Sequence, residues 1–257
     1  MPGSIQSIER AAAVLRLLGG AGRPLALAEV AAPLDLPRPT AHGILRTLRD
    51  VGFVDQDRDT GRYSLGAGLR QLHGGWDGHE LRSRAMNWAD SLAGSSGHEV
   101  LLGMPASSGS GTAGVEVVHH VFRPDGSRQR LRTGQVLPLH ASAVGKCLLA
   151  FAPVAVPPLH QLDLQRYTGR TVVTVGLLTE HLAVARHRGW AGELGEHRTG
   201  VGGVAAPVRT GGGLVVGALG VEGPVEELYS GGVPVPRLVE QLANAAREIS
   251  AGLEVGR

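Results

Sequence analysis

The sequence predicts an α+β fold in two parts, a small N-terminal unit and a larger domain with an antiparallel sheet. In the first 65 residues, apolar residues recur at helical spacing and two short β-type runs follow. Beyond residue 80, short strands alternate with glycine-rich and proline-rich turns, and helical segments lie near both ends. Strands flanked by helices in this way are typical of α+β domains.

Three helices are expected at the start of the chain. Apolar residues at helical spacing predict the first over residues 5–18, and a second, short helix over residues 25–33 ends at a proline. The third begins near Pro39, because the first turn of a helix tolerates proline, and it ends at Gly52.

A β-hairpin is expected directly after the third helix. Residues 53–56 and 62–65 have strand character, and the polar turn between them ends in Gly61. Three helices and a hairpin in this order predict a winged helix-turn-helix over residues 4–66. Glycines interrupt the short helical stretch at residues 67–79, which indicates a linker.

Residues 80–257 are expected to form the second domain. Helices are predicted over residues 80–93, 142–151, 179–188 and 235–253. Strands are predicted over residues 100–104, 114–122, 129–133, 201–209 and 214–221.

Composition limits the classes of protein that the chain can belong to. Apolar residues make up 42% of the 257 residues, which is enough for packed cores. The net charge of only +2 means that any nucleic-acid binding must come from a local basic patch. Cys147 is the single cysteine, so no intramolecular disulfide can form and a reducing cytoplasm fits. The sequence shows neither a signal peptide nor a membrane-spanning run, so we expect no membrane partner.

The third helix has the chemistry of a DNA-reading helix. Its inward positions are apolar, and its outward positions carry hydrogen-bond donors: Arg38, Thr40, His42 and Arg46. Such a helix fits the major groove, where arginine pairs with guanine, whereas Thr40 is better placed for a phosphate. The alternative is an ordinary amphipathic surface helix, but the hairpin that follows favours DNA binding.

Two arginines in the predicted wing are further candidates. Arg58 and Arg62 could reach the DNA backbone or the minor groove, and solvated turn residues remain an equal alternative.

Two motifs that suggest enzymes do not support one here. Residues 109–114 match G-x-G-x-x-G, but a strand-like run follows where a dinucleotide site needs a helix, so a hairpin loop is expected. Cys147 lies in an apolar helical run, where a buried and inert thiol is expected rather than a nucleophile activated by His140. His119 and His120 are adjacent on a strand and would point to opposite faces. We therefore expect no catalytic residue, metal site or cofactor.

The helix that begins at Ser142 has two interpretations. Ser142 is a plausible N-cap, and Gly145 allows something to approach the helix start closely. The approaching group could be an anionic ligand at the helix N-terminus, or the sheet, with the helix packed tightly against it. The motif does not decide between them.

Together these segments resemble the IclR family of bacterial transcription factors, over nearly the whole chain and in the same order. The segments that carry the resemblance are Ile5–Ala11, Leu36–His42, Gly52–Val54, Arg62–Gly66, Leu137–Lys146, Arg188–Ala191, Val204–Val208 and Gly217–Pro224. Within the family, residues 40–48, 79–82 and 118–129 are most similar to regulators of glycerol catabolic operons. Most family members carry arginine where this chain has Gly43.

The resemblance implies a GAF-like effector domain with a ligand pocket. It places His140, Ala141, Ser142 and Gly145 at the pocket's helix start, and Glu193, Gly203, Gly220 and Glu222 on its strands. Relatives that bind small oxoacids have hydroxyl or thiol groups at the last three positions, so glycerol 3-phosphate or glycerol is the better expectation. Glu193 or Glu222 would accept hydroxyl groups, and the helix start, helped by His140 or Arg130, would hold a phosphate.

These observations lead to one functional hypothesis. The chain is expected to be a cytoplasmic transcription regulator, more plausibly a repressor, that binds operator DNA under the control of a small metabolite. The resemblance implies a dimer, and in many family members a tetramer. The alternatives are an enzyme acting on a small molecule, for which no nucleophile–base pair is visible, and a protein-interaction module with the same two domains.

Overall fold

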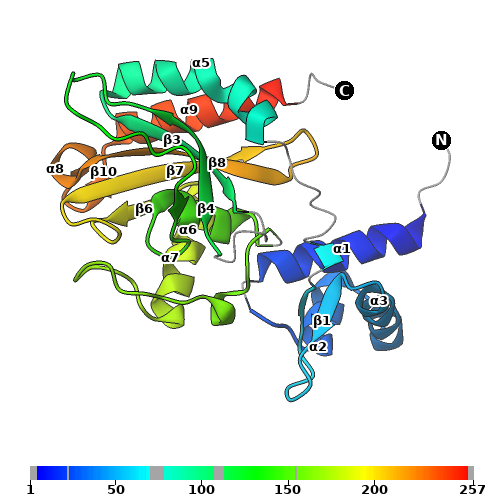
Figure 1. The fold of residues 1–257 in the computed structure, drawn as a ribbon. Helices are drawn as coiled ribbons and strands as arrows, with labels where there is room; N and C mark the ends of the chain where they lie inside the picture. The colour runs from blue at the N-terminus through cyan, green and yellow to red at the C-terminus, as the bar shows by residue number, and fades with distance from the viewer. Residues whose placement is uncertain are drawn as a thin grey trace. The chain divides into compact units, whose positions relative to one another are not determined.

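The structure is a computed structural model that divides into two compact units, residues 1–75 and 76–257 (Figure 1). It describes residues 5–21, 23–66, 68–69, 78–106, 113–153 and 155–253. None of the helices in these ranges combines the length and hydropathy that a bilayer crossing requires.

The first unit contains the three predicted helices and the hairpin. Its elements are α1 (Gln6–Gly20), α2 (Leu27–Ala31) with the 3₁₀ turn η1 (Ala32–Leu34), α3 (Arg38–Asp50), β1 (Val54–Gln56) and β2 (Tyr63–Leu65). The two strands pair antiparallel, and Val54 lies opposite Leu65. Val14, Val30 and Leu45 are fully buried at the centre of a core to which every helix contributes. The expected winged helix-turn-helix is therefore present.

Local chemistry sets the ends of α3. Pro39 lies in the first turn, where its missing N–H leaves no hydrogen bond unmade. Gly52 has a φ of 77°, a left-handed conformation that glycine adopts without steric cost, and this residue turns the chain from α3 into β1.

The second unit is a six-stranded antiparallel sheet with helices on both faces. Its helices include α5 (Gly78–Ser96), α6 (Ala143–Phe151), α7 (Val175–Arg188), α8 (Val225–Leu228) and α9 (Pro236–Gly252), with the 3₁₀ turn η3 (Leu159–Gln161). The sheet runs in the order β5-β4-β3-β8-β7-β6. These strands are β3 (Glu99–Pro105), β4 (Val115–Val121), β5 (Val136–Leu137), β6 (Ala191–Leu194), β7 (Val201–Arg209) and β8 (Val215–Pro224). A separate pair consists of β9 (Tyr229–Ser230) and β10 (Val233–Pro234).

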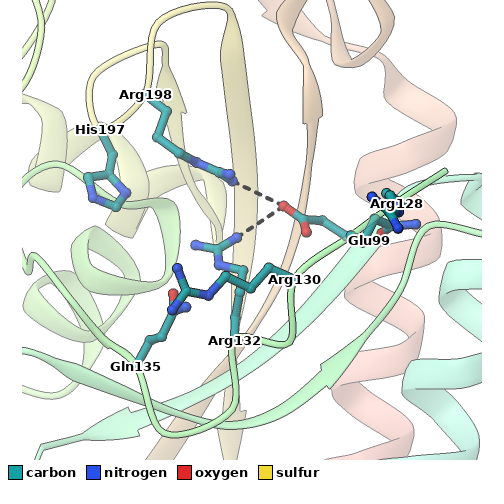
Figure 2. A pocket seen from close by; sticks show the side chains of 8 residues that line it. Glu99, Arg128, Arg130, Arg132, Gln135, His197 and Arg198 are labelled. Atoms are coloured by element: carbon teal, nitrogen blue, oxygen red, sulfur yellow. Dashed lines mark hydrogen bonds and ion pairs between the residues drawn. The ribbon is translucent and has the colours of Figure 1, made fainter.

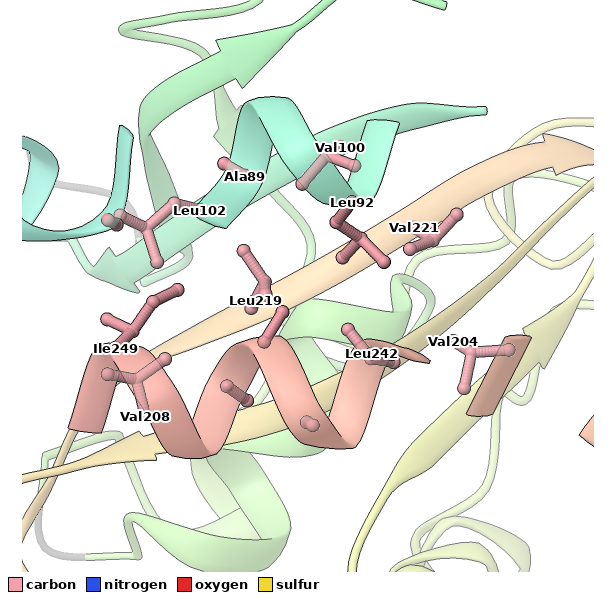
Figure 3. Close-up of a cluster of buried hydrophobic side chains, with 14 of the residues drawn as sticks. Ala89, Leu92, Val100, Leu102, Val204, Val208, Leu219, Val221, Leu242 and Ile249 are labelled. Carbon is pink, nitrogen blue, oxygen red and sulfur yellow. The ribbon is translucent and has the colours of Figure 1, made fainter. Parts of the chain in front are cut away.

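Alternating side chains give the sheet a core on each face. Figure 3 shows Leu219 and Val221 of β8 packed with Leu92 of α5 and Leu242 of α9. Ala218, the residue before Leu219, belongs to the core on the opposite face, to which α6 and α7 contribute. Because successive strand residues point to opposite faces, the even-numbered positions of β8 from 218 to 222 face α6.

The structure corrects one predicted strand and adds others. Residues 129–133 form no strand, and the ladder next to β4 is made by the short β5 instead. Strands β6, β9 and β10 were not predicted, because runs of two to four residues carry too little periodicity. Most of the predicted linker, and most of the expected hairpin loop at residues 109–114, lie outside the described residues. The chain does enter β4 directly after Gly114, so a strand follows that loop and a dinucleotide site is excluded.

Candidate functional site

The predicted DNA-reading residues lie together on the open face of α3. Arg38, His42 and Arg46 are exposed and Thr40 is half-buried, while Ala41 and Leu45 anchor the opposite face in the core. Within the described residues, the side chains of Arg38, His42 and Arg46 form no hydrogen bond or ion pair. Their donors therefore remain available to a ligand. Gly43 adds open space, because a Cβ there would meet nothing within 4 Å.

The two wing arginines differ from each other. Arg58 lies at the exposed hairpin tip and has no partner in the described part of the chain. Arg62 instead donates to Glu29 Oε2 at 2.8 Å and to the Pro24 carbonyl at 3.2 Å. Glu29 also pairs with Arg23 and accepts the Ala26 N–H, and these partners, led by Arg23, hold its pKa at about 2. Arg62 therefore ties the wing to the start of α2.

The effector residues predicted on the strands share one face of the sheet. Glu193 of β6 lies opposite Gly203 of β7, and Gly203 lies opposite Glu222 of β8. Two positions along β8, Gly220 points the same way, toward α6. The register therefore brings these four positions to the face that α6 covers.

Protein atoms fill the glycine positions beneath α6. A Cβ on Gly145 would lie 2.5 Å from the carbonyl oxygens of Pro138 and Leu139, and one on Gly220 would lie 2.7 Å from Val144. A Cβ on Gly203 would lie 3.1 Å from the Cβ of Ala143. These glycines allow α6 to pack closely on the sheet and on the preceding loop. Gly145 is therefore tightly packed, but against the loop before α6 rather than against the sheet.

The cap of α6 comes from the chain itself. Ser142 caps the helix as expected, accepting the Gly145 N–H at 3.1 Å and donating to the Pro138 carbonyl at 2.7 Å. His140 and Ala141 are buried beside it, and the His140 ring lies 2.9 Å from the Gln165 carbonyl. The Tyr167 ring contacts both histidines: it is tilted against His140, with centroids 5.8 Å apart, and edge-on to His197, with centroids 5.1 Å apart.

Glu193 is a buried carboxyl group. Its side chain accepts the Glu196 N–H at 2.7 Å, and the residue is 2% exposed. Burial, with a smaller contribution from the nearby carboxylates of Glu222 and Glu196, raises the pKa of Glu193 to about 8. At neutral pH this group is therefore largely protonated, so it can donate a hydrogen bond to a ligand as well as accept one.

Glu222 belongs to a compact ion-pair network. It lies directly opposite Glu99 of β3, an arrangement that would be repulsive if the two carboxylates were alone. Arg132 and Arg198 each contact both carboxylates, at 2.6 Å for Glu222 and 3.0 Å for Glu99. Burial opposes the ionisation of Glu99, but the bonds from His120 and these two arginines outweigh it and hold its pKa at about 2.

A cavity of about 350 Å³ opens beside this network (Figure 2). Its wall is strongly basic, and the lining residues are Glu99, Arg128, Gln129, Arg130, Arg132, Gln135, His197 and Arg198. A second cavity, of about 420 Å³, shares Glu99, Gln129 and Arg198 with the first and is richer in carboxylates, including Asp125, Glu222 and Glu226. Of the eight predicted effector residues, Glu222 lines one of these two cavities, and the other seven line neither.

Sequence reasoning missed most of the cavity lining. A signal was present, because Arg128, Arg130 and Arg132 recur at every second position, a spacing that would put them on one side of an extended segment. Arg198 had no local signal, since it arrives from a turn some 65 residues later in the sequence. That turn is anchored by Lys146, whose buried ammonium donates to the Glu196 carboxylate at 2.5 and 2.6 Å.

The residues that could have suggested catalysis are inert or separated. Cys147 is completely buried, and burial raises the pKa of its thiol well above the usual range. His120 contacts Glu99 on one face of the sheet, whereas the charges of Arg82 and Asp90 in α5 act on His119 on the other. Among the described residues, histidine, cysteine and acidic side chains form no group that could hold a metal ion.

Comparison with known proteins identifies the class of protein. The IclR helix-turn-helix domain matches residues 7–58, and the domain described as bacterial transcriptional regulator IclR C-terminal matches residues 74–251. The chain belongs to the IclR family. It is therefore a transcriptional regulator rather than an enzyme, as expected.

Full-length relatives have the same organisation. The chain is 47% identical to a glycerol operon regulatory protein of Streptomyces griseus and 46% identical to one of Streptomyces coelicolor, over the entire length of each. An IclR transcriptional regulator from Alicyclobacillus acidocaldarius has a TM-score of 0.57 at 26% identity, over 98% of this chain and 100% of that one. The Thermotoga maritima IclR structure shares the fold, with a TM-score of 0.60 at 20% identity, over 97% of this chain and 99% of that one.

Proposed function

We propose that this IclR-family regulator represses a glycerol catabolic operon by binding operator DNA through α3, and that a small metabolite of the pathway controls this binding. The observation that carries the DNA part is the row of unpaired donors on α3, together with its position in a winged helix-turn-helix. The glycerol part rests on the two full-length relatives, whose names describe glycerol operon regulatory proteins.

The proposed reading of DNA uses Arg38, His42 and Arg46. An arginine that pairs with the O6 and N7 edge of guanine contributes about 1–3 kcal/mol of discrimination. Thr40, at the helix start, is assigned to a phosphate. Arg58 is assigned to the DNA backbone, whereas Arg62 has a smaller role because Glu29 already holds it.

The proposed effector is glycerol 3-phosphate or glycerol, bound in the second unit. Glu222 and the cavities beside it support this assignment, because carboxylates accept hydroxyl groups and arginines bind phosphate. The remaining predicted effector residues lie at the start of α6 or on the sheet face that α6 covers. The proposed DNA-binding domain spans residues 4–66, the linker residues 67–79 and the effector-binding domain residues 80–257.

Regulation is proposed to act through a dimer or a pair of dimers. A two-fold dimer reads two half-sites about one helical turn, ~34–36 Å, or a multiple apart. Effector and operator each shift the same conformational equilibrium, so each changes the affinity of the other by the same factor. Acting on operator DNA, the protein would work in the cytoplasm.

A gel-shift experiment tests the proposal. The full-length protein is titrated onto the DNA upstream of its own gene, with unrelated DNA as competitor and at increasing salt. We expect specific binding that weakens as salt rises. Arg38→Ala and Arg46→Ala should each weaken specific binding by about 10-fold or more, since each removes a base contact.

Matched variants show whether the effect is specific. Arg62→Ala removes the same charge from the same unit and should weaken binding less, because its guanidinium is paired. Arg237→Ala, on the exposed surface of α9, should leave binding unchanged. If the α3 variants bind as tightly as wild type, the proposed recognition surface is wrong.

A further inference from the structure

We infer that the basic cavity at Arg128 and Arg130 is a phosphate site, so that the effector is a phosphorylated polyol and not a neutral one. This inference rests on the proposed function and goes further, because it assigns the ligand's charged group to particular arginines. The resemblance implied only that Arg130 would help the start of α6 to hold a phosphate, and Arg128 was not predicted.

The charges around the cavity leave a positive excess. Arg132 and Arg198 are each paired with both Glu99 and Glu222, so that two cations face two carboxylates. Arg128 and Arg130 line the same cavity, and in the described part of the chain neither forms a hydrogen bond or an ion pair. The wall of the cavity therefore carries two uncompensated positive charges.

A phosphate monoester matches this excess. It carries a charge of about −1.5 to −2 at pH 7 and offers three strong acceptor oxygens. The planar guanidinium group suits this geometry, since it can donate two parallel hydrogen bonds to one phosphate. Figure 2 shows Arg130 and Arg132 side by side, with Arg198 and His197 on the facing turn, so donors approach from more than one element.

The geometry near the cavity also limits what else the ligand carries. The adjoining cavity shares Glu99, Gln129 and Arg198 with the basic one. It adds Arg123, which pairs with Asp125, and the carboxylate of Glu226, which forms no ion pair within the described residues. Carboxylates accept hydrogen bonds from hydroxyl groups and repel a second anionic group. A ligand that spans both cavities would therefore carry its phosphate at one end and hydroxyl groups at the other. Cavities of about 350 and 420 Å³ are within the ordinary size range for small-molecule sites.

Calorimetric titration of the full-length protein tests this site. The probes are glycerol 3-phosphate, glycerol and inorganic phosphate, each titrated separately at the same pH and salt concentration. We expect saturable binding of glycerol 3-phosphate, at least tenfold weaker binding of inorganic phosphate, and no measurable binding of glycerol at those concentrations. Equal affinity for glycerol and glycerol 3-phosphate, or for inorganic phosphate and glycerol 3-phosphate, would overturn the inference.

A double variant assigns the binding to the two arginines. Arg128→Gln with Arg130→Gln should weaken glycerol 3-phosphate binding at least tenfold, because hydrogen bonds between charged groups contribute that much. Arg237→Gln is the matched control, since it removes an exposed positive charge from α9 and should leave the affinity unchanged. Both exposed arginines lack partners, so the double variant should unfold at the wild-type temperature. Unchanged affinity in a folded double variant would refute the site.

Gel shifts with the same proteins separate this inference from the proposed function. Without ligand, the double variant should bind operator DNA like wild type, but glycerol 3-phosphate should no longer alter its binding. If wild type binds the operator and the double variant responds to ligand as wild type does, the phosphate site fails and the regulator remains. If ligand binding depends on the arginines but no DNA is bound, the proposed function fails and the site remains.

Discussion

The surface of α3 and the basic cavity both present arginines, but the chain builds them differently. On α3, Arg38, His42 and Arg46 come from nine consecutive residues of one helix, and helical periodicity alone puts them on one face. In the cavity, Arg132 and Arg198 come from separate segments and meet across two facing carboxylates. The first surface depends on local structure. The second depends on strand register and on the turn that Lys146 anchors through Glu196.

This difference predicts where substitutions are tolerated. Around the exposed face of α3, new atoms meet solvent, and charges can be removed without leaving a buried partner. In and beneath α6, Lys146 pairs with a buried carboxylate, and Gly145, Gly203 and Gly220 make room for neighbouring atoms. Substitutions at four positions test this contrast, and their expected effects on stability decrease from the first to the last.

Removal of the buried ammonium group should have the largest effect. Lys146 is 1% exposed and burial lowers its pKa, yet it is the cation that compensates Glu196. Lys146→Met leaves that carboxylate buried and unpaired, which typically costs about 3–5 kcal/mol of unfolding free energy. Urea unfolding followed by circular dichroism measures the loss. The double variant Lys146→Met with Glu196→Gln should recover most of it, and a single variant as stable as wild type would contradict the prediction.

The carboxyl group of Glu193 should make stability depend on pH. Its pKa is about 8 in the folded chain against an ordinary 4.5, so from about pH 5 to 8 the unfolded state binds fewer protons than the folded state. Stability therefore falls with rising pH, by up to ~1.4 kcal/mol per pH unit, and the fall stops above about pH 8. Glu193→Gln cannot ionise and should lack this component. If the unfolding free energies of the two proteins change with pH in the same way across this range, the assignment is wrong.

A methyl group at Gly145 should destabilise the second unit. The new Cβ would lie 2.5 Å from two backbone carbonyl oxygens, and backbone atoms cannot rotate away as a side chain does. Overpacking of this kind costs about 1–3 kcal/mol. Thermal unfolding of Gly145→Ala measures the loss, and an unchanged melting temperature would show that the loop before α6 can move.

The same substitution at Gly43 should have the opposite sign and the smallest size. A Cβ there meets nothing within 4 Å, and alanine is favoured over glycine in a helix interior by about 0.5–1 kcal/mol. Gly43→Ala should therefore raise the melting temperature of the first unit. A lower melting temperature would contradict the open surroundings of Gly43.

Sequence patterns predicted the parts of the fold that local chemistry controls. The three helices, the hairpin and the N-cap at Ser142 follow from periodicity, proline, glycine and hydroxyl groups within a few residues. The short strand β6 was missed because its four residues gain their structure from pairing with β7. Residues 129–133 were predicted as a strand because their sequence alternates, but they have no partner in the sheet.

The candidate effector site was predicted less completely than the DNA-reading helix. The resemblance to the IclR family placed Glu193, Gly203, Gly220 and Glu222 on one face of the sheet, and the register agrees. It did not foresee that α6 closes over the glycines. Nor did it foresee that Glu222 is already paired with two arginines.

The sequence by itself determined that this chain has a basic helix in a winged unit, followed by an α+β domain without the motifs of an enzyme. Such features depend on residues close together in the chain, so spacing is enough to find them. Only the tertiary structure decided which arginines are free to bind a ligand. Whether an arginine is paired depends on the carboxylates that distant strands bring within hydrogen-bonding reach. A pattern within a short stretch of sequence does not predict the distance between such groups.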